Sequence, residues 1–384
     1  MKTKYLLLSI VIAAPVFLFQ ACKKNAFPPE CIGKSQIVTT TKVFATGLNN
    51  PRGLKFGPDG NLYVAEGGIG GSNLSTTCMQ VAPPVGPVTG SVDGGRISSI
   101  DGSGVRTTWV ENLPSSQSAV TQGSLVSGVA DVAFVGKTLY ALLTGAGCAH
   151  GVPTIPNGVV RINPDRSWTM AADLSSYVVS HPVANVDSSD FDPDGTWYGM
   201  VSAGDNLFVT GSNHQEVDRV NTSGEIHRLA DISATYPGHG HWIGPTSIVY
   251  HQGNLYFGTL TTFPLVSGSA NVYKLTPDGK FSVYASGFSA ILGITFDGFG
   301  ALYVLENFTG NPFPTAGTGD IVRVDPSGTR QVITSGLNLP TAMTLGPDGK
   351  LYVSNWGFGP PAIGGGQILQ ISFKCEAVWS DTKD

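Results

Sequence analysis

Hydrophobic positions along the chain recur as one short triplet: a leucine, an aromatic residue and a third apolar residue. The six copies are Leu62-Tyr63-Val64, Leu139-Tyr140-Ala141, Leu207-Phe208-Val209, Leu255-Tyr256-Phe257, Leu302-Tyr303-Val304 and Leu351-Tyr352-Val353. Successive copies lie 77, 68, 48, 47 and 49 residues apart. The last three intervals match one four-stranded propeller blade, and the first two match a blade with insertions. The pattern therefore predicts an all-β fold, a six-bladed β-propeller.

Polar and glycine residues mark the turns between the apolar strands. In the first blade the pattern predicts four strands, called a to d, at 53–56, 62–65, 95–100 and 105–111. Asp-Gly and Ser-Gly pairs join a to b and c to d, because glycine tolerates positive φ there. Strands reverse at every turn, so these turns share one face of the ring, the turn face. The b–c and d–a connections share the opposite face, the loop face.

The long insertions all fall on the loop face. They are residues 67–94, 145–157, 175–196, 235–244 and 307–319. Recognition residues concentrate on loops that a rigid scaffold holds. We therefore expect function on this face.

The two ends of the chain are predicted to close the ring. The last blade supplies strands at 342–345, 351–354 and 367–373 but lacks a d strand. Residues 37–48 resemble the d strands of other blades, down to the closing glycine and hydrophobic residue. We expect this N-terminal strand to complete the last blade, since an open ring would expose unpaired strand edges.

The first residues resemble a bacterial lipoprotein signal. Lys2 and Lys4 precede an apolar stretch, residues 5–19, that is short for a membrane span. It ends at Leu18-Phe19-Gln20-Ala21-Cys22. The resemblance implies cleavage before Cys22 and a lipid on its sulfur; simple secretion with a free Cys22 is the alternative. Either way the domain folds outside the cytoplasm, facing the periplasm or on the cell surface.

The predicted organisation is a signal peptide at 1–21, a linker at 22–36, a single propeller at 37–376 and a tail at 377–384. Composition agrees with one globular domain. The chain has 50 Gly, 25 Pro, 13% charged and 41% hydrophobic residues, which is too apolar for disorder. A net charge of −5 without a Lys/Arg run argues against nucleic acid as a partner. We expect a monomer that touches a membrane only through its lipid.

Four cysteines remain besides Cys22, and they allow three disulfide connectivities. Cys31 precedes the closing strand and Cys375 follows the last c strand, so a bridge between them would replace the missing c–d turn. Cys78 and Cys148 lie in the b–c loops of the first two blades, and we predict the second bridge there. Free buried thiols are the alternative.

Several motifs resemble the ScyD/ScyE family of secreted six-bladed, NHL/SMP-30-like propellers. They include Gly244-Pro245-Thr246-Ser247-Ile248, Leu302-Tyr303-Val304-Leu305-Glu306 and Leu351-Tyr352-Val353-Ser354-Asn355. The resemblance implies an extracytoplasmic propeller and implies no particular reaction. Blade three departs from it: Thr196-Trp197-Tyr198-Gly199 stands where members tend to have Asn-Pro-Tyr-Gly, and Gly211 stands in place of an Asp.

The first candidate site lies at the loop-face ends of the b strands. Alignment of the repeats predicts that Glu66, Glu306 and Asn355 converge near the channel mouth, with Arg52 on the same face. Carboxylate and amide oxygens suit Ca²⁺, sugar hydroxyls or acid–base chemistry. The alternative is an ion pair between Glu66 and Arg52 with solvated neighbours.

The second candidate is a group of loop-face histidines, chiefly His239 and His241 beside Trp242, with His214. Imidazoles are good metal ligands, and the tryptophan ring would stack on a sugar or an aromatic ligand. A histidine pair alone is short of the three protein ligands of a catalytic zinc site. Surface histidines without a metal are the alternative.

The third candidate is an acidic loop that begins like a calcium loop. Asp190, Asp192 and Asp194 alternate before Gly195, but Val201 occupies the twelfth position, where a bidentate glutamate is required. The alternative is a Pro-Asp-Gly turn. Ca²⁺ is the one cofactor that these patterns suggest.

Two classes of function remain open. The first is a lipid-anchored propeller that binds a small molecule, a glycan or a protein on its loop face, because no convincing catalytic set stands out. The second is an enzyme: a metal-dependent lactonase of the gluconolactonase type or, with less support, a quinone-dependent sugar dehydrogenase. The residues aligned at the start of each a strand offer no good metal ligand; they are Arg52, Ala130, Tyr198, Thr246, Leu292 and Thr341.

Overall fold

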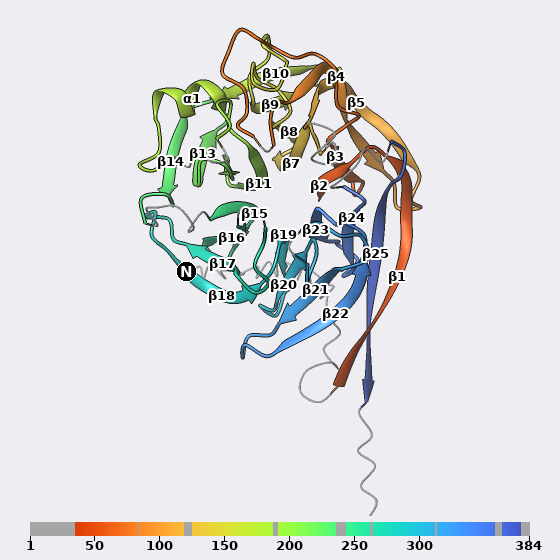
Figure 1. Ribbon diagram of the computed structural model, residues 1–384. Coiled ribbons are helices and arrows are strands. Elements are labelled where there is room, and N and C mark those ends of the chain that lie inside the picture. The colour runs from red at the N-terminus through yellow and green to blue at the C-terminus, as the bar shows by residue number, and fades with distance from the viewer. Residues whose placement is uncertain are drawn as a thin grey trace, which may run out of the picture.

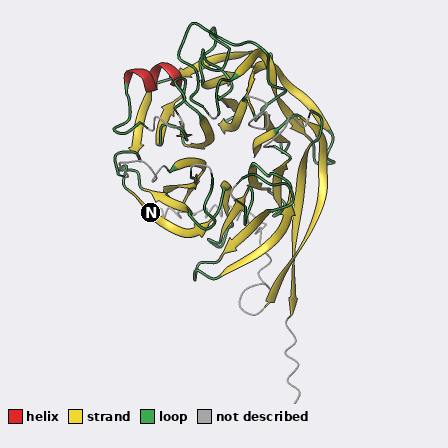
Figure 2. Ribbon diagram, in the orientation of Figure 1, coloured by secondary structure: helices red, strands yellow, loops and turns green. Residues whose placement is uncertain are grey.

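The computed structural model describes residues 35–377, except 84, 119–124, 187–190, 236–242, 262–263, 312 and 358–362; for 35–36 and 375–377 it describes the backbone alone. The described chain forms six antiparallel sheets set around an axis, joined by loops and with one short helix (Figures 1 and 2). The predicted six-bladed propeller is confirmed.

Each sheet is one blade, with its first strand next to the axis. Blade one contains β2 (Pro51–Phe56), β3 (Leu62–Glu66), β4 (Thr89–Ile100), β5 (Arg106–Gln117) and the short β6 (Val126–Ser127). Blade two contains β7 (Val129–Val135), β8 (Thr138–Leu143), β9 (Gly158–Ile162) and β10 (Trp168–Asp173). Blade three contains β11 (Trp197–Ala203), β12 (Asn206–Gly211), β13 (Glu216–Asn221) and β14 (Ile226–Asp231).

The second half of the ring follows the same order. Blade four contains β15 (Gly244–His251), β16 (Asn254–Leu260), β17 (Ala270–Leu275) and β18 (Phe281–Phe288). Blade five contains β19 (Ile291–Phe296), β20 (Leu302–Glu306), β21 (Gly319–Val324) and β22 (Arg330–Leu337). The described residues include the helix α1 (Leu174–Ser180), whose N-terminus is capped by the Asp173 carboxylate. No helix in the described part of the chain is long and apolar enough to cross a membrane.

Blade six is built from both ends of the chain. It contains β23 (Ala342–Leu345), β24 (Leu351–Asn355), β25 (Gly366–Ala377) and the N-terminal β1 (Ser35–Leu48). β1 pairs with β25 from Leu48 opposite Gly366 to Ser35 opposite Ala377, which confirms the predicted closure. β24 begins opposite Ile371, so the last part of β25 and the start of β1 pair with each other beyond it as a two-stranded ribbon at the rim of the ring (Figure 1).

The repeated Gly-Pro-Asp-Gly-x-Leu-Tyr-Val phrase is a self-contained turn. In blade one the Asp59 carboxylate accepts hydrogen bonds from the Asn61 backbone N–H at 3.1 Å and from the Tyr63 hydroxyl at 2.9 Å. A Cβ at Gly57 would lie 2.6 Å from the Tyr63 ring, so only glycine leaves room for it. Gly60 has a φ of 84°, which favours glycine. Because every requirement is local, the phrase recurs nearly unchanged in blade six.

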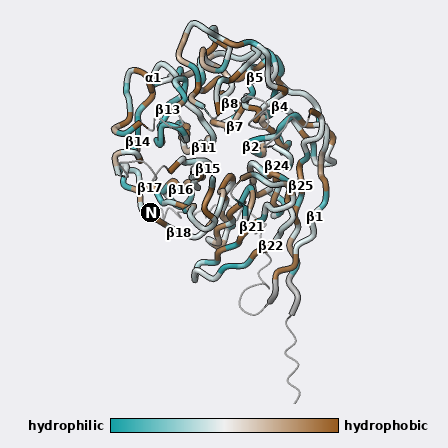
Figure 3. The backbone as a smooth tube through the Cα atoms, in the orientation of Figure 1, coloured by the Kyte–Doolittle hydropathy of each residue, from teal (hydrophilic) through white to brown (hydrophobic). Residues whose placement is uncertain are grey.

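Hydrophobic side chains of neighbouring blades pack into shared clusters. Tyr63 and Ala65 of blade one, for example, pack with Val129 and Val132 of blade two. Hydrophobic and hydrophilic stretches alternate along the chain all around the ring (Figure 3). Since each blade buries its faces against the next, the ring has one continuous core.

Candidate functional site

A cavity of about 190 Å³ opens on the loop face at the axis of the ring. Its base is formed by the residues that begin the inner strands: Arg52, Ala130, Tyr198, Thr246 and Leu292. These are five of the six positions that the repeat alignment placed at the start of strand a. The inner strands therefore hold the cavity base, and the loop-face insertions supply its walls.

Tyr198 closes the bottom of the cavity. Its hydroxyl donates a hydrogen bond of 2.9 Å to the Thr341 carbonyl of blade six, on the opposite side of the ring, and also bonds with the Arg52 side chain. Tyr198 also lines a small space of about 20 Å³ farther along the axis, beside Lys55 and Asp131. Burial raises the pKa of Tyr198 more than the neighbouring Arg52 lowers it. The side chain is therefore a neutral phenol.

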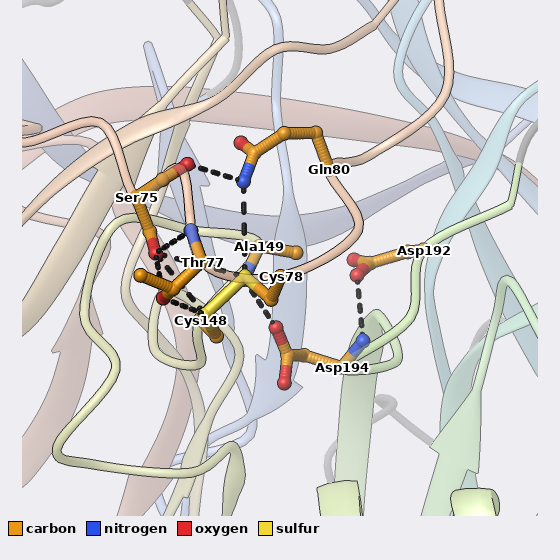
Figure 4. The surroundings of a disulfide bond; sticks show 8 residues. All are labelled: Ser75, Thr77, Cys78, Gln80, Cys148, Ala149, Asp192 and Asp194. Carbon is orange, nitrogen blue, oxygen red and sulfur yellow. Dashed lines mark hydrogen bonds between the residues drawn. A yellow bond between two sulfur atoms is a disulfide. The ribbon is translucent and has the colours of Figure 1, made fainter.

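One wall of the cavity is apolar and covalently braced. Val81, Val85 and Val88 of the blade-one insertion line it and pack with the buried Ala149. The predicted disulfide between Cys78 and Cys148 is present, with the Cα atoms 6.1 Å apart (Figure 4). The bridge ties the insertion to the blade-two loop that carries Ala149. Cys31 lies outside the described residues, so the Cys31–Cys375 bridge stays a prediction.

Another part of the cavity lining is polar. It is formed by the buried side chains of Ser116, His150 and Asp192, which we call the relay. The Ser116 Oγ lies 2.8 Å from His150 Nδ1, and His150 Nε2 lies 2.9 Å from Asp192 Oδ2. The exposed fractions of the three residues are 0%, 5% and 2%, and all three line the cavity. The residues come from blade one, the blade-two loop and the segment before blade three, so the fold alone brings them together.

Two of these side chains form a buried ion pair. Burial alone would lower the pKa of His150, but the Asp192 carboxylate and their hydrogen bond raise it by more. Burial alone would raise the pKa of Asp192, but His150 lowers it by more. The Thr196 hydroxyl also donates to Asp192 Oδ2 at 2.8 Å. The arrangement therefore holds an ionised carboxylate against an imidazole whose other nitrogen faces a serine hydroxyl.

Sequence reasoning does not single out this relay. No pattern marks Ser116, the acidic loop suggests a calcium ligand at Asp192, and His150 is one loop-face histidine among several. One signal was present: Cys148 lies two residues before His150, and the predicted bridge to Cys78 places that histidine beneath the blade-one insertion.

The three side chains at the ends of b strands that were predicted to converge at the channel mouth lie away from the cavity. Glu66, Glu306 and Asn355 are absent from the cavity lining, and of that predicted group only Arg52 lies there. Each accepts a hydrogen bond from a backbone N–H just before an inner strand: those of Asn49, Ser289 and Asn338. The prediction of convergence was wrong because these side chains turn toward the d–a connection of their own blade.

Each of these side chains also has a partner on strand c. Glu66 pairs with Arg96 at 2.8 Å, in place of the alternative pairing with Arg52. Glu306 lies opposite Asp320, and burial together with the Glu306 carboxylate raises the pKa of Asp320 to about 8. These contacts stabilise each blade at its loop-face end.

In blade three the corresponding carboxylate comes from strand c instead of strand b. Gly211 has no side chain. A Cβ at Gly211 would lie only 2.9 Å from the Cγ of Glu216, its partner across the ladder. Arg228 pairs with Glu216 at 2.5 Å. Blade three thus has a buried acidic residue at this position, supplied by strand c.

The other predicted residues lie apart or outside the described chain. His214 is buried, and its Nε2 is 3.0 Å from the Asp192 carbonyl. His239, His241, Trp242 and Asp190 lie outside the described residues. Asp194 accepts a hydrogen bond of 2.6 Å from the Ala149 N–H, so both described aspartates of the acidic loop bond to protein groups (Figure 4). Among the described residues, no group of three or more His, Cys, Asp or Glu side chains is placed to hold a metal ion.

Comparisons with known proteins agree on the fold. No protein-family model matches the sequence, and no curated protein matches it. A Bacteroides thetaiotaomicron VPI-5482 protein of unknown function matches with a TM-score of 0.54 at 12% identity, over 88% of this chain and 77% of that chain. The chain is a six-bladed β-propeller.

Two further solved structures resemble this propeller. An oxidoreductase of Thermus thermophilus, described as a glucose dehydrogenase, matches with a TM-score of 0.51 at 16% identity, over 87% of this chain and 99% of that chain. Another glucose dehydrogenase matches with a TM-score of 0.50 at 12% identity, over 86% and 98%. Identities this low establish a shared architecture, and the chemistry of this propeller must be argued from its own residues.

Proposed function

We propose that this protein is an extracytoplasmic, lipid-anchored propeller of ScyD/ScyE type that binds a small molecule in its loop-face cavity. The observation that carries the proposal is the cavity itself, a preformed hollow with apolar walls and a few convergent polar groups. Such a combination is typical of small-molecule sites.

The size and lining of the cavity suggest the chemical class of its ligand. A cavity of about 150 Å³ accommodates benzene. The volume of about 190 Å³ here therefore suits a molecule of one ring or a short acyl chain. The valine wall favours an apolar body, whereas the relay and Arg52 favour one polar group on it. A folded protein partner or a long glycan would need a larger surface than this hollow offers.

Ligand-induced stabilisation tests the proposal. The melting temperature of the purified chain is measured with small aromatic alcohols, short-chain esters and lactones. A ligand at a hundred times its Kd stabilises the folded state by about 2.7 kcal/mol. Val85→Trp, which fills the cavity from its apolar wall, should abolish the shift. Val92→Trp is the matched control, because Val92 is exposed on β4 of the same blade. If a ligand still raises the melting temperature of Val85→Trp, it binds outside this cavity.

The proposed location has a separate test. Mass spectrometry of the mature N-terminus from bacterial membranes should find a diacylglyceryl group on Cys22, and Cys22→Ser should release the protein from the membrane. An unmodified N-terminus beginning elsewhere would refute the anchor. The enzymatic alternatives are tested by measuring metal content and then activity on a lactone panel.

A further inference from the structure

We propose that Ser116, His150 and Asp192 act as nucleophile, base and orienting acid in the hydrolysis of small carboxylic esters. The inference rests on the proposed function, since the acyl part of the ester would occupy the same cavity. It adds a reaction to a site argued so far only as a binding pocket.

The first support is geometric. Both links of the relay have hydrogen-bond length, 2.8 Å from Ser116 to His150 and 2.9 Å from His150 to Asp192. Asp192, as a carboxylate, accepts a hydrogen bond from the N–H at His150 Nε2, which leaves the Nδ1 lone pair facing the serine hydroxyl. A nucleophile beside a base that a third group orients is the arrangement that activates serine.

The second support is that each member is held in place. The Asp192 backbone N–H donates to Asn213 Oδ1 at 2.9 Å, and the Asp194 N–H donates to Asp192 Oδ1 at 3.1 Å. Asp194 in turn accepts from the Ala149 N–H, next to His150. Together with the disulfide at Cys148, these contacts fix the histidine loop against the aspartate turn, as a preorganised site requires.

The third support is a nearby positive charge. The Arg52 guanidinium donates to the Val126 carbonyl, and the adjacent Ser127 pairs with Ser116 between β6 and β5. Arg52 therefore lies near the serine and lines the same cavity. A cation in this position would stabilise the negative oxygen that forms during attack on an ester.

The position of the relay restricts the substrate. Ser116 is fully buried and His150 is 5% exposed, so an ester must approach through the cavity, past Val81 and Val88. Only a short or single-ring acyl group fits the available volume. We therefore expect acetyl, butyryl and benzoyl esters to react, and long-chain esters to be excluded.

The reaction balances without a cofactor. Ser116 Oγ attacks the carbonyl carbon while its proton passes to His150 Nδ1. The bond to the alcohol oxygen breaks, and the leaving alcohol takes that proton. Water then attacks the acyl-serine and gives a proton to Nδ1, and Ser116 recovers the proton as the carboxylic acid leaves. The net change is ester plus water to acid plus alcohol.

The test uses the full chain with its disulfide intact. Hydrolysis of p-nitrophenyl acetate, butyrate and benzoate is followed, and a fluorophosphonate probe is mapped by peptide mass spectrometry. We expect the probe on Ser116, and rates that fall by at least about a hundredfold in Ser116→Ala and His150→Gln. The rate should rise with pH as His150 loses its proton. Ser99→Ala is the control, a buried serine of blade one that does not line the cavity.

The outcomes separate this inference from the binding proposal. Labelling of another residue, or an unchanged rate in Ser116→Ala, would overturn the relay. If small ring compounds stabilise the protein but no ester reacts, the relay is wrong and binding stands. If no compound binds and no ester reacts, both fail. Ser116→Ala should still unfold in one cooperative transition in denaturant, which shows that its loss of rate is not a loss of folding.

Discussion

Replacing Asp192 by asparagine removes the negative charge that faces His150 while keeping the size of the side chain. In the folded protein only 3% of the Asp192 side chain and 6% of the His150 side chain are exposed, so water cannot replace the lost interaction. Breaking a buried ion pair by removing one partner costs about 3–5 kcal/mol. Asparagine keeps a hydrogen bond, so we expect the free energy of unfolding to fall by about 3 kcal/mol near pH 5.5.

The loss of stability in Asp192→Asn depends on pH because both Asp192 and His150 titrate. The pKa of Asp192 is lowered in the folded state, so its contribution is present above the unfolded value near pH 4 and disappears as the pH falls through the folded pKa. The pKa of His150 is raised, so its contribution is complete below about pH 6.5 and disappears as the pH rises through the folded pKa. The difference between the wild type and Asp192→Asn is therefore largest from about pH 4 to 6.5.

Denaturant unfolding at pH 5.5 and pH 8.5, without reductant, measures this difference. We expect Asp192→Asn to be less costly at pH 8.5, because the contribution of His150 disappears as the pH rises through its folded pKa. In a His150→Asn background the same substitution should cost equally at both pH values, because no imidazole that changes its charge remains opposite Asp192. An equal cost at both pH values in the wild-type background would refute the argument that charge stabilises the pair.

Three further predictions concern other parts of the fold. Cys78→Ser opens a loop with a sequence separation of 70 residues and should cost about 4 kcal/mol in the chain-entropy estimate; the wild type with reductant should unfold at the same denaturant concentration as the variant. Glu66→Gln and Glu306→Gln should lower the melting temperature yet leave the ligand-induced shift unchanged, and a loss of that shift would contradict their structural role. Tyr198→Phe leaves the Thr341 carbonyl without its donor and should cost about 1–3 kcal/mol in denaturant unfolding.

The architecture could be predicted from sequence because its determinants are local. Asp59, Gly57 and Tyr63 satisfy one another within a single turn, so the same letters recur wherever that turn recurs. The closing strand was predictable for a related reason: it carries the pattern of a d strand, and blade six lacks one. The number of blades in a propeller can therefore be counted in its sequence.

The candidate site could be predicted only in part. The structure places the cavity on the face where strand direction led us to expect function, and it confirms the predicted disulfide between Cys78 and Cys148. The relay was missed because Ser116, His150 and Asp192 come from three blades and share no spacing. Glu66 and Glu306 were misplaced because repeat alignment gives the height of a side chain in the ring and not the direction in which it turns. That direction is set by the backbone N–H groups they satisfy.

The two-stranded ribbon at blade six has a practical consequence. Six residues of β25 continue past Ile371 alongside the first residues of β1. This ribbon packs along β22 of blade five, where Ile37 is buried and the Gln331 side chain donates a hydrogen bond to the Ile37 carbonyl. The described chain thus starts and stops on the side away from the cavity mouth. A fluorophore, an affinity tag or a sensor chip attached beside Ser35 or Ala377 would therefore leave the mouth unobstructed, and immobilised protein could report on its ligands directly.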